Sequence, residues 1–190
     1  SKSLVTEQGL PCLNDLAVLE IDQAMQEKIL DHVVKMALIV KQSVYPFFEA
    51  GMKCGYDMMR AFALGMGLPE DSFLKAIDKP IARSSIIHYP PQPEYLGEKQ
   101  FGVAPHTDNG SITLLWQDQV GGLEIQTSDG EWVTAHPIEN TIVVNIGDLL
   151  MRWTNEVFKS TPHRVVNRKG EERYSMVVAW DPNFDTVVDP

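Results

Sequence analysis

The first third of the chain carries apolar residues at helical spacing. Between about residues 22 and 42, one row of apolar side chains recurs every four residues and a second row lies beside it: Met25, Ile29, Val33 and Ala37, then Leu30, Val34 and Leu38. Spacing of this kind predicts an amphipathic helix. We expect its apolar stripe to pack against a sheet, which is the usual role of such stripes in globular proteins.

A second apolar stripe follows Pro46. Its members again recur at helical spacing: Met52, Tyr56, Met59, Ala63 and Met66. Proline lacks a backbone N–H and crowds the preceding turn, so Pro46 is expected to interrupt or kink the helical pattern. The helix is expected to end near Gly65, Gly67 and Pro69, because glycine and proline are common at helix ends. The pattern therefore predicts two helices or one bent helix, followed by a short helix over residues 70–77.

Beyond Pro80 the pattern changes to short strands separated by turn residues. Strands are expected over residues 82–89, 101–108, 111–117, 123–127, 132–136, 141–146, 158–166 and 173–180. Turn pairs lie between them, among them Gly147-Asp148, whose aspartate is interpreted as a cap or turn acceptor. This succession of short strands predicts a mainly β jelly roll built from residues 81–190, with residues 1–80 as a helical layer that packs on the barrel.

The composition is that of a folded globular protein. Of the 190 residues, 44% are hydrophobic and 22% are charged, so one structural domain with its own core is expected. The formal net charge is -10 and the basic residues are scattered, which argues against a nucleic-acid partner. No pattern in the sequence indicates an oligomeric state.

The sequence shows no sign of export or of membrane insertion. No stretch approaches the length of a membrane span, and Ser1-Lys2-Ser3 is not followed by an apolar signal core. Cys12 and Cys54 are too few for a disulfide framework, so we expect reduced packing thiols in a cytoplasmic protein. Because the chain begins without Met and stops abruptly at Pro190, we expect that the ends of a longer protein are absent.

His106-Thr107-Asp108 stands at the end of a predicted strand. Residues two apart on a strand project from the same face, so the imidazole and the carboxylate would converge on one point. The pair alone is a weak signal, because a histidine and an aspartate at this spacing commonly form a surface hydrogen-bonded pair.

His163 lies in a later strand that a jelly roll can place beside His106. Two imidazoles and one carboxylate form the facial triad of non-haem iron(II), which leaves coordination positions open for other ligands. Zinc hydrolases use similar ligand sets, so the triad alone does not identify the metal. The remaining histidines have no comparable setting and are expected to be structural or exposed: His32, His88 and His136.

Arg173 and Ser175 lie on one face of the last predicted strand. A planar guanidinium suits a carboxylate in bidentate geometry, and a nearby hydroxyl adds a third hydrogen bond. A dicarboxylate could therefore bridge a metal at the triad and Arg173. The alternative is that Arg173 pairs with an acidic neighbour on the acidic surface of the protein.

Together these segments resemble the 2-oxoglutarate and iron(II)-dependent dioxygenases, in the branch similar to isopenicillin N synthase. The matching segments follow the order and spacing of that family: His88-Tyr89-Pro90-Pro91, Pro105-His106-Thr107-Asp108, Gly121-Gly122-Leu123-Glu124-Ile125-Gln126, Asn145-Ile146-Gly147-Asp148, Lys159-Ser160-Thr161-Pro162-His163-Arg164-Val165 and Arg173-Tyr174-Ser175-Met176. The resemblance covers the chain from about residue 45 to its end, and the earlier residues carry no motif of the family.

The resemblance implies a double-stranded β-helix, as in cupins, in which His106, Asp108 and His163 hold Fe(II). It implies that Arg173 and Ser175 hold the far carboxylate of the co-substrate 2-oxoglutarate. Residues 81–190 would then be the catalytic core.

The resemblance also implies a reaction. The keto acid chelates the iron, O2 is consumed, succinate and CO2 are released, and a small organic substrate is oxidised. Halogenating relatives replace the carboxylate at the position of Asp108 with a small residue, so hydroxylation or desaturation is implied instead. Tyr89 matches a position that often contacts the co-substrate; the alternative is a tyrosine packed in the barrel with its hydroxyl satisfied elsewhere.

Two other functions stay open at this point. One is an iron oxidase of the same fold that does not use 2-oxoglutarate, as in isopenicillin N synthase. The other is a non-catalytic jelly-roll module that holds a metal or ligand without turnover. The family usually carries further segments at both ends of the chain that contact the substrate, so the substrate itself is not predicted.

Overall fold

The computed structural model of the protein describes residues 23–92, 101–167 and 169–189. The chain divides into two compact units, residues 1–45 and 46–190, which we describe separately. Helix α1 (Gln23–Gly65) contributes residues to both units. The boundary predicted at residue 80 rests on the change from helices to strands and stays a prediction.

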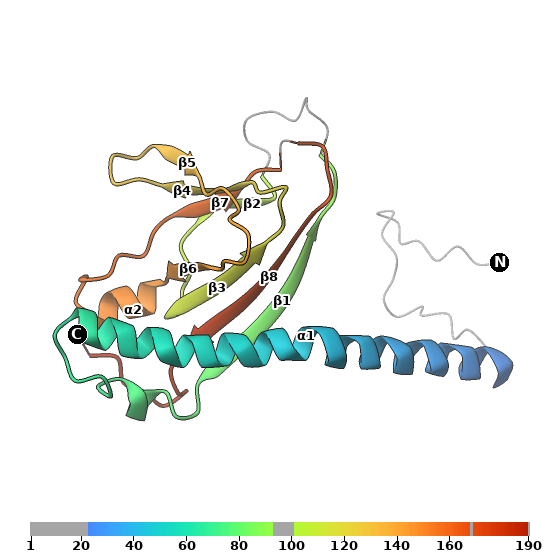
Figure 1. Ribbon diagram of the computed structural model, residues 1–190, viewed down its shortest axis with the longest axis horizontal. Coiled ribbons are helices and arrows are strands. Elements are labelled where there is room, and N and C mark those ends of the chain that lie inside the picture. Colours follow the sequence, from blue (N-terminus) through green and yellow to red (C-terminus); the bar gives the residue numbers. More distant parts are fainter. Residues whose placement is uncertain (1–22, 93–100, 168, 190) are drawn as a thin grey trace, which may run out of the picture. The chain divides into compact units, whose positions relative to one another are not determined.

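Helix α1 is a single helix that contains Pro46 (Figure 1). Of the two predicted alternatives, two helices or one, the structure has one. A proline removes one backbone hydrogen bond, and helix-forming residues after it, such as Glu49 and Ala50, continue the helix to Gly65.

In the first unit the apolar stripe of α1 is exposed. Its large described side chains have relative exposures between 48% and 63%: Leu30, Val33, Val34 and Leu38. The side chains of Met25 and Ile29 lie outside the described ones. The described part of the first unit contains no strand, so the expectation that this stripe packs against a sheet stays a prediction. Helical periodicity determines which face is apolar, but it does not supply a partner for that face.

The apolar character of α1 does not make it a membrane span. Among the described residues, no helix combines the length and the hydropathy that crossing a bilayer would require.

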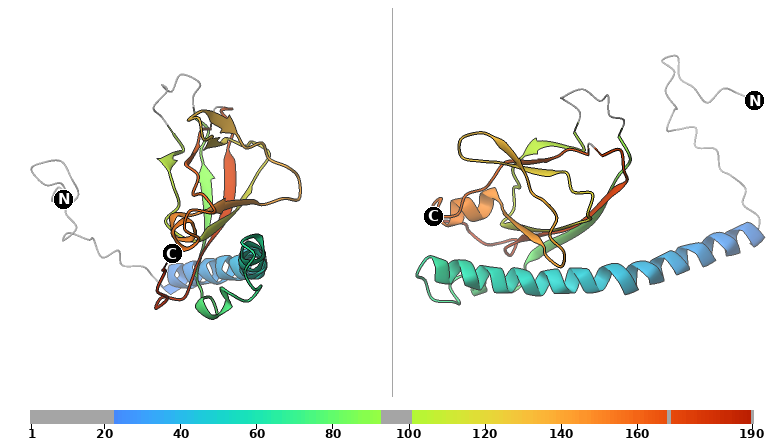
Figure 2. Two further views of the ribbon diagram at one scale, coloured as in Figure 1. Left: turned by 90° about the vertical axis from the view of Figure 1, so that its left-hand side faces the viewer. Right: turned by 45° about the horizontal axis from the view of Figure 1, so that its top comes forward.

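In the second unit, two four-stranded antiparallel sheets account for the strands of the described residues (Figures 1 and 2). The strands are β1 (Ile81–Tyr89), β2 (Val103–His106), β3 (Ile112–Gln117), β4 (Leu123–Gln126), β5 (Trp132–Thr134), β6 (Val143–Ile146), β7 (His163–Val165) and β8 (Arg173–Asp181). One sheet has the order β1-β8-β3-β6 and the other has the order β2-β7-β4-β5. The predicted jelly roll is confirmed.

Between the strands, the structure differs from the sequence-based expectation in two places. A short helix, α2 (Asp148–Trp153), begins where a turn was predicted, with Gly147 as its N-cap residue. Asp148 lies in the first turn of α2, where a carboxylate interacts favourably with the helix dipole. The helix predicted over residues 70–77 is reduced to turns and one 3-10 helix, Leu74–Ala76.

The part of α1 that belongs to the second unit forms much of the core. Met59 and Ala63 are fully buried, and further members of the stripe pack against the same cluster: Met52, Tyr56 and Met66. The outer face of β8 supplies Val178 and Trp180, which are also fully buried. The packing role predicted for this stripe is confirmed.

Cys54 belongs to this packed face of α1 and carries a free thiol. Burial and the nearby Asp57 carboxylate raise the pKa of the Cys54 thiol, so the thiol stays protonated and unreactive. This agrees with the predicted packing role. Cys12 lies outside the described residues.

Two glycines allow α1 to approach β8 closely. A Cβ atom at Gly51 would lie 2.8 Å from the Val178 side chain, and one at Gly55 would lie 2.7 Å from the Trp180 ring. The Trp180 ring also packs edge-on against Tyr56, with 5.2 Å between ring centroids. There is no room for a methyl group at either glycine unless the core shifts.

We therefore predict that Gly55→Ala destabilises the protein. Overpacking against the rigid Trp180 ring should lower the free energy of unfolding by about 1–3 kcal/mol, reduced by the higher helix propensity of alanine. Gly65→Ala is the matched control, because a Cβ there meets only the Phe158 ring at 3.6 Å. Denaturant unfolding measures both variants. Equal stability of the two variants would contradict the close approach of α1 to β8.

Candidate metal centre

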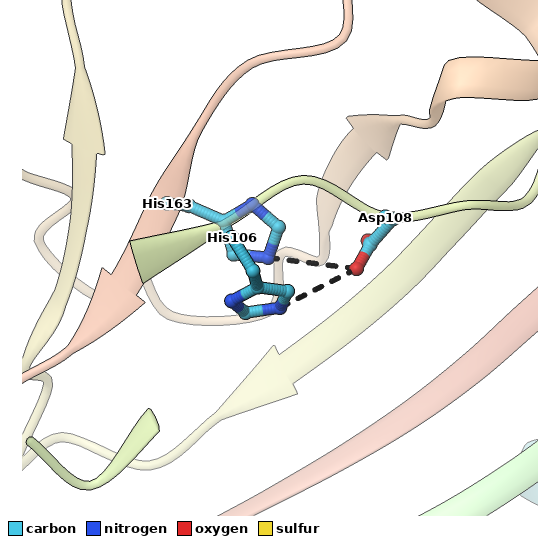
Figure 3. Close-up of side chains that lie close together, drawn as sticks. All are labelled: His106, Asp108 and His163. Atoms are coloured by element: carbon cyan, nitrogen blue, oxygen red, sulfur yellow. Dashed lines mark ion pairs between the residues drawn. The ribbon is translucent and has the colours of Figure 1, made fainter. Parts of the chain in front are cut away.

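His106, Asp108 and His163 meet at one end of a cavity in the second unit (Figure 3). His106 ends β2 and His163 begins β7, and the two residues are direct partners in the antiparallel pair. Asp108 follows β2 by two residues. Its Oδ1 lies 3.6 Å from Nε2 of His106 and 3.7 Å from Nε2 of His163. One ligand atom from each side chain lies within 4.8 Å of the other two.

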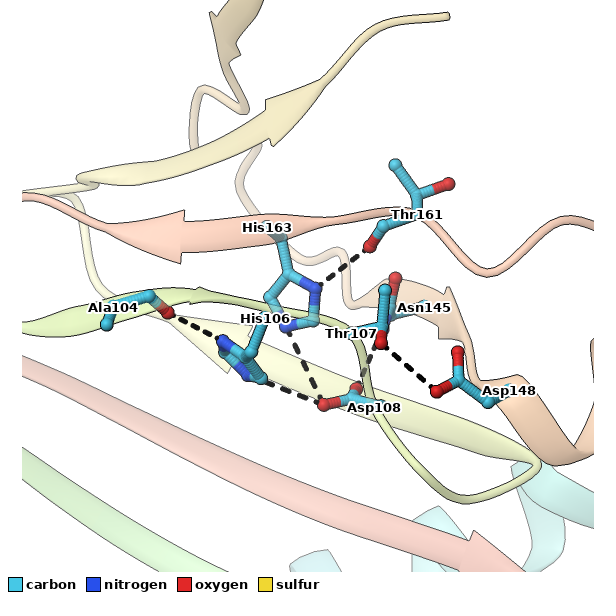
Figure 4. Close-up of polar contacts among 8 residues, drawn as sticks. All are labelled: Ala104, His106, Thr107, Asp108, Asn145, Asp148, Thr161 and His163. Atoms are coloured by element: carbon cyan, nitrogen blue, oxygen red, sulfur yellow. Dashed lines mark hydrogen bonds and ion pairs between the residues drawn. The ribbon is translucent and has the colours of Figure 1, made fainter. Parts of the chain in front are cut away.

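Backbone carbonyls fix the orientation of both imidazole rings (Figure 4). The Nδ1 atom of His106 lies 2.9 Å from the Ala104 carbonyl oxygen, and that of His163 lies 3.1 Å from the Thr161 carbonyl oxygen. A carbonyl can only accept, so Nδ1 is the donor in each ring, and a neutral imidazole held in this way presents the lone pair of Nε2. Histidines that bind metals are commonly held in this way.

Asp108 is oriented by a side-chain amide. The Nδ2 atom of Asn145, on β6, donates to Oδ2 of Asp108 at 2.7 Å. This bond occupies one carboxylate oxygen and leaves Oδ1 facing the two Nε2 atoms (Figure 4).

The first turn of α2 fixes the backbone around Asp108. The N–H of Asp148 donates to the Asp108 carbonyl at 2.7 Å, and the Thr107 hydroxyl donates to the Asp148 carboxylate at 3.1 Å. A Cβ at Gly147 would lie 2.0 Å from the Gly110 carbonyl oxygen, so the chain closes here only with glycine. Asp148 thus has a positioning role as a hydrogen-bond acceptor, as its sequence suggested.

Strand β7, which carries His163, also contacts neighbouring strands on its outer face through Arg164. Arg164 forms an ion pair with Glu124 of β4, with Nη2 and Oε2 2.6 Å apart. The Arg164 guanidinium also lies 4.2 Å from the centroid of the Trp132 ring on β5. Both contacts are partly buried, and they hold the strand that carries His163 in place.

The cavity has a volume of about 230 Å³ and reaches from the three ligands to Arg173 and Ser175 on β8. Apolar side chains such as Leu115 and Val177 form much of its wall. The exposed side-chain fraction falls from 39% at His106 to 13% at His163, while Arg173 and Ser175 are fully buried. The cavity therefore has an exposed end at the ligands and a buried end at Arg173.

Arg173 is held by three neighbours at the buried end. Its Nε donates to the Gly121 carbonyl, and its Nη2 donates to Oε1 of Gln117 at 3.2 Å. The Tyr89 ring stacks on the guanidinium, 4.5 Å from its central carbon. Gly121 has a φ of 75°, which a residue with a side chain rarely adopts, and this turn brings its carbonyl to Arg173.

Two polar atoms at this end have no partner among the described residues. They are Nη1 of Arg173 and Oγ of Ser175, both buried. Leaving a buried charged donor unpaired is costly, so the site favours an acceptor that approaches from the cavity. A carboxylate fits this pair, because it can accept from the guanidinium and from the hydroxyl together.

The donor set suits a divalent transition metal. Two neutral imidazoles and one carboxylate leave coordination positions free on the cavity side, as in iron(II) oxygenase sites. Zinc accepts the same donors, but the distant carboxylate-binding pair is not needed for a zinc hydrolase. A keto acid with a second carboxylate could use the free metal positions and the buried end together.

A family model decides between these classes. The model described as the 2OG-Fe(II) oxygenase superfamily matches residues 81–182, just over half of the chain. This chain belongs to that superfamily. The predicted family and its cofactors, iron(II) and 2-oxoglutarate, are confirmed at the level of the family.

Individual relatives agree with this assignment. A 2-oxoglutarate-Fe(II) type oxidoreductase of Emericella nidulans is 36% identical over 149 residues, which cover 77% of this chain and 43% of the relative. A solved Neurospora crassa protein in complex with alpha-KG is 38% identical, with a TM-score of 0.75, and the match covers 79% of this chain and 49% of that protein. The Neurospora crassa protein has also been solved with alpha-KG and thymine.

A second solved structure contains both the co-substrate and the metal. JOX2 in complex with 2OG, Fe and JA is 30% identical, with a TM-score of 0.74, and the match covers 80% of this chain and 45% of that protein. This chain spans less than half the length of the relative and of both solved proteins.

Within the superfamily fold, sequence patterns missed two positioning residues. Asn145 stands in a matched segment, but nothing in its spacing indicated a bond to Asp108. Gln117 lies on β3, and its contact with Arg173 depends on the pairing of β3 with β8, which no local pattern reveals. The other histidines are exposed and do not line the cavity, as expected: His32, His88 and His136.

We predict that Asn145→Ala weakens metal binding. Loss of the amide frees Asp108 to rotate, and such outer hydrogen bonds contribute about ten- to a hundredfold to metal affinity. Titration with Co(II), followed by its visible spectrum, measures the change. Gln119→Ala is the control, because Gln119 is exposed in the turn after β3 and does not line the cavity. If both variants bind Co(II) like the native protein, Asn145 does not orient the carboxylate.

Proposed function

We propose that this chain is the catalytic core of an iron(II)- and 2-oxoglutarate-dependent dioxygenase that hydroxylates or desaturates a small organic substrate, with release of succinate and CO2. One observation carries the proposal. Three metal-ligand side chains meet at the exposed end of a cavity, and at its buried end Nη1 of Arg173 and Oγ of Ser175 have no partner among the described residues. A keto acid with a second carboxylate would occupy both ends of this cavity, one end at the metal and the other at the guanidinium.

In this proposal His106, Asp108 and His163 hold Fe(II) through two Nε2 atoms and Oδ1. Arg173 and Ser175 hold the far carboxylate of 2-oxoglutarate. The bound iron and keto acid supply the oxygen activation, coupled to decarboxylation of the keto acid. Tyr89 shapes the co-substrate site by stacking on Arg173, and contact of its hydroxyl with 2-oxoglutarate is part of the proposal.

The chain's own residues position the reactants and exclude water. The buried end is closed by Tyr89, Gln117 and Leu123, each less than 10% exposed, so the far carboxylate would exchange water for fixed donors. The carboxylate of Asp108 supports hydroxylation or desaturation, since halogenation needs its position on iron for a halide. The cavity volume supports a small substrate, as does thymine bound to the Neurospora crassa protein.

Two features disfavour the other functions considered. The far carboxylate of 2-oxoglutarate would pair with Nη1 of Arg173 and Oγ of Ser175, whereas an iron oxidase without 2-oxoglutarate would need a substrate carboxylate at this buried end. A module that only binds a metal has no need of the open cavity beside the ligands.

A cytoplasmic location is also part of the proposal, and it rests on the sequence alone.

Succinate release tests the proposed reaction. The native protein with Fe(II), O2 and 2-oxoglutarate should release succinate slowly even without substrate, because uncoupled turnover is common when the site is open. His163→Ala should abolish the release and bind Fe(II) at least tenfold more weakly, since it removes one of three ligands. Arg60→Ala, an exposed change on α1, is the control. Succinate release by His163→Ala at the native rate would contradict the assignment.

Arg173 should affect co-substrate binding but not metal binding. Anaerobic addition of 2-oxoglutarate to the Fe(II) protein should produce a weak visible charge-transfer band. In Arg173→Ala the band should require about ten- to a hundredfold more 2-oxoglutarate, because a charged hydrogen bond contributes roughly 1.5–3 kcal/mol. Ser175→Ala should give a smaller shift in the same direction. Unchanged titration in both variants would show that the far carboxylate binds elsewhere.

A further inference from the structure

The inner face of the β1-β8-β3-β6 sheet can be followed residue by residue. Strands β1 and β8 pair without interruption, from Ile81 opposite Asp181 to Tyr89 opposite Arg173. Every second residue of a strand lies on the same face. Since Ile87 and Tyr89 line the cavity, Arg83 and Ser85 share their side of β1.

Arg83 lies in the cross-strand row that leads to the metal ligands. It is opposite Ala179 on β8, which is opposite Thr113 on β3, which is opposite Asn145 on β6. Asn145 donates to the metal-facing carboxylate of Asp108. Three strand spacings separate the backbones of Arg83 and Asn145, roughly 14 Å, and the long arginine side chain can cover a large part of this distance.

Arg83 and Arg173 occupy the two ends of this face in different ways. Arg173 is fully buried and held by Gln117, Gly121 and Tyr89. Arg83 is exposed, and it makes no hydrogen bond or ion pair with any other residue of the described ranges. It lies beyond Ala179, just outside the residues that line the cavity.

None of the described carboxylates pairs with Arg83, although the chain has 26 acidic residues against 16 basic ones. Asp181 lies on the same face, diagonally from Arg83, but its Oδ1 accepts from the Ser111 N–H at 2.9 Å. A guanidinium stays charged at all physiological pH values and offers paired donors that match a carboxylate.

Between Arg83 and the ligands, the inner face is mostly apolar. Ala179, Val177 and Leu115 line this stretch, and Thr113 lies beside Ala179. A molecule that crosses it would place an apolar body over these side chains. Its charged end would lie at the exposed mouth, away from the co-substrate end.

We propose that Arg83 is a specificity-determining residue that binds the carboxylate of an organic-acid substrate at the exposed mouth of the cavity. The proposal rests on the proposed function, because it assigns the substrate class of the same site. The apolar part of the acid lies over Ala179 and Thr113, which directs a carbon atom toward the metal ligands. The substrate carboxylate and the far carboxylate of 2-oxoglutarate are then bound by different arginines at opposite ends of one face.

Matched acids and amides test this assignment. The probes are phenylacetate with phenylacetamide and hexanoate with hexanamide, which differ in charge but little in shape. Each is added anaerobically to the protein with Fe(II) and saturating 2-oxoglutarate, and binding is followed by perturbation of the charge-transfer band. Succinate release in air is then measured with the same probes. Native protein, Arg83→Gln and the exposed control Arg60→Gln are compared.

The native protein should bind at least one acid at least tenfold more tightly than its amide, and that acid should accelerate succinate release. Arg83→Gln should remove the preference for the acid while leaving the band itself unchanged, and Arg60→Gln should behave like the native protein. If the native protein shows no preference for acids, or if Arg83→Gln keeps it, the inference is overturned. If instead no band and no succinate appear in the native protein, the proposed function fails, and the inference with it. An acid that abolishes the band has displaced 2-oxoglutarate from Arg173, and a preference confined to such acids also overturns the inference.

Discussion

The pairing of β2 with β7 is the constraint on which the candidate site depends. It places His106 and His163 opposite each other, with ring centroids 4.3 Å apart, although the two residues are distant in the sequence. Carbonyls of the same two chain segments then fix the rings, so that both Nε2 atoms face Asp108. A ligand set assembled in this way exists only when the double-stranded β-helix is closed, so metal binding should be coupled to folding.

The β1-β8-β3-β6 sheet determines the order of polar and apolar groups along the cavity. Along β8, inward-facing residues change from the buried Arg173 and Ser175 to Val177 and Ala179 near the exposed end. The outward-facing Val178 and Trp180 pack under α1 and hold the strand in place. Strand β8 therefore contributes both to the core and to the order of groups along the cavity. The segment that carries Asp108 is joined to the same sheet by the hydrogen bond from Asn145 on β6.

Much of this could be predicted from the sequence, because the relevant signals are local or carried by a motif. Alternation along residues 173–180 placed Arg173 and Ser175 on one face, and the two-residue spacing of His106 and Asp108 placed those side chains together. The roles of Asn145 and Gln117 could not be predicted, since each depends on a partner brought close by strand pairing. Helix α2 was missed because its six residues carry too little periodicity to differ from a turn.

The central claim is that one cavity holds a metal at one end and the far carboxylate of 2-oxoglutarate at the other. The most direct measurement is an anaerobic crystal structure with Mn(II), an unreactive substitute for Fe(II), and 2-oxoglutarate. The account predicts Mn(II) bound by Nε2 of His106, Nε2 of His163 and Oδ1 of Asp108, with the far carboxylate hydrogen-bonded to Arg173 Nη1 and Ser175 Oγ. A metal bound by other side chains, or a keto acid that does not contact Arg173, would contradict it.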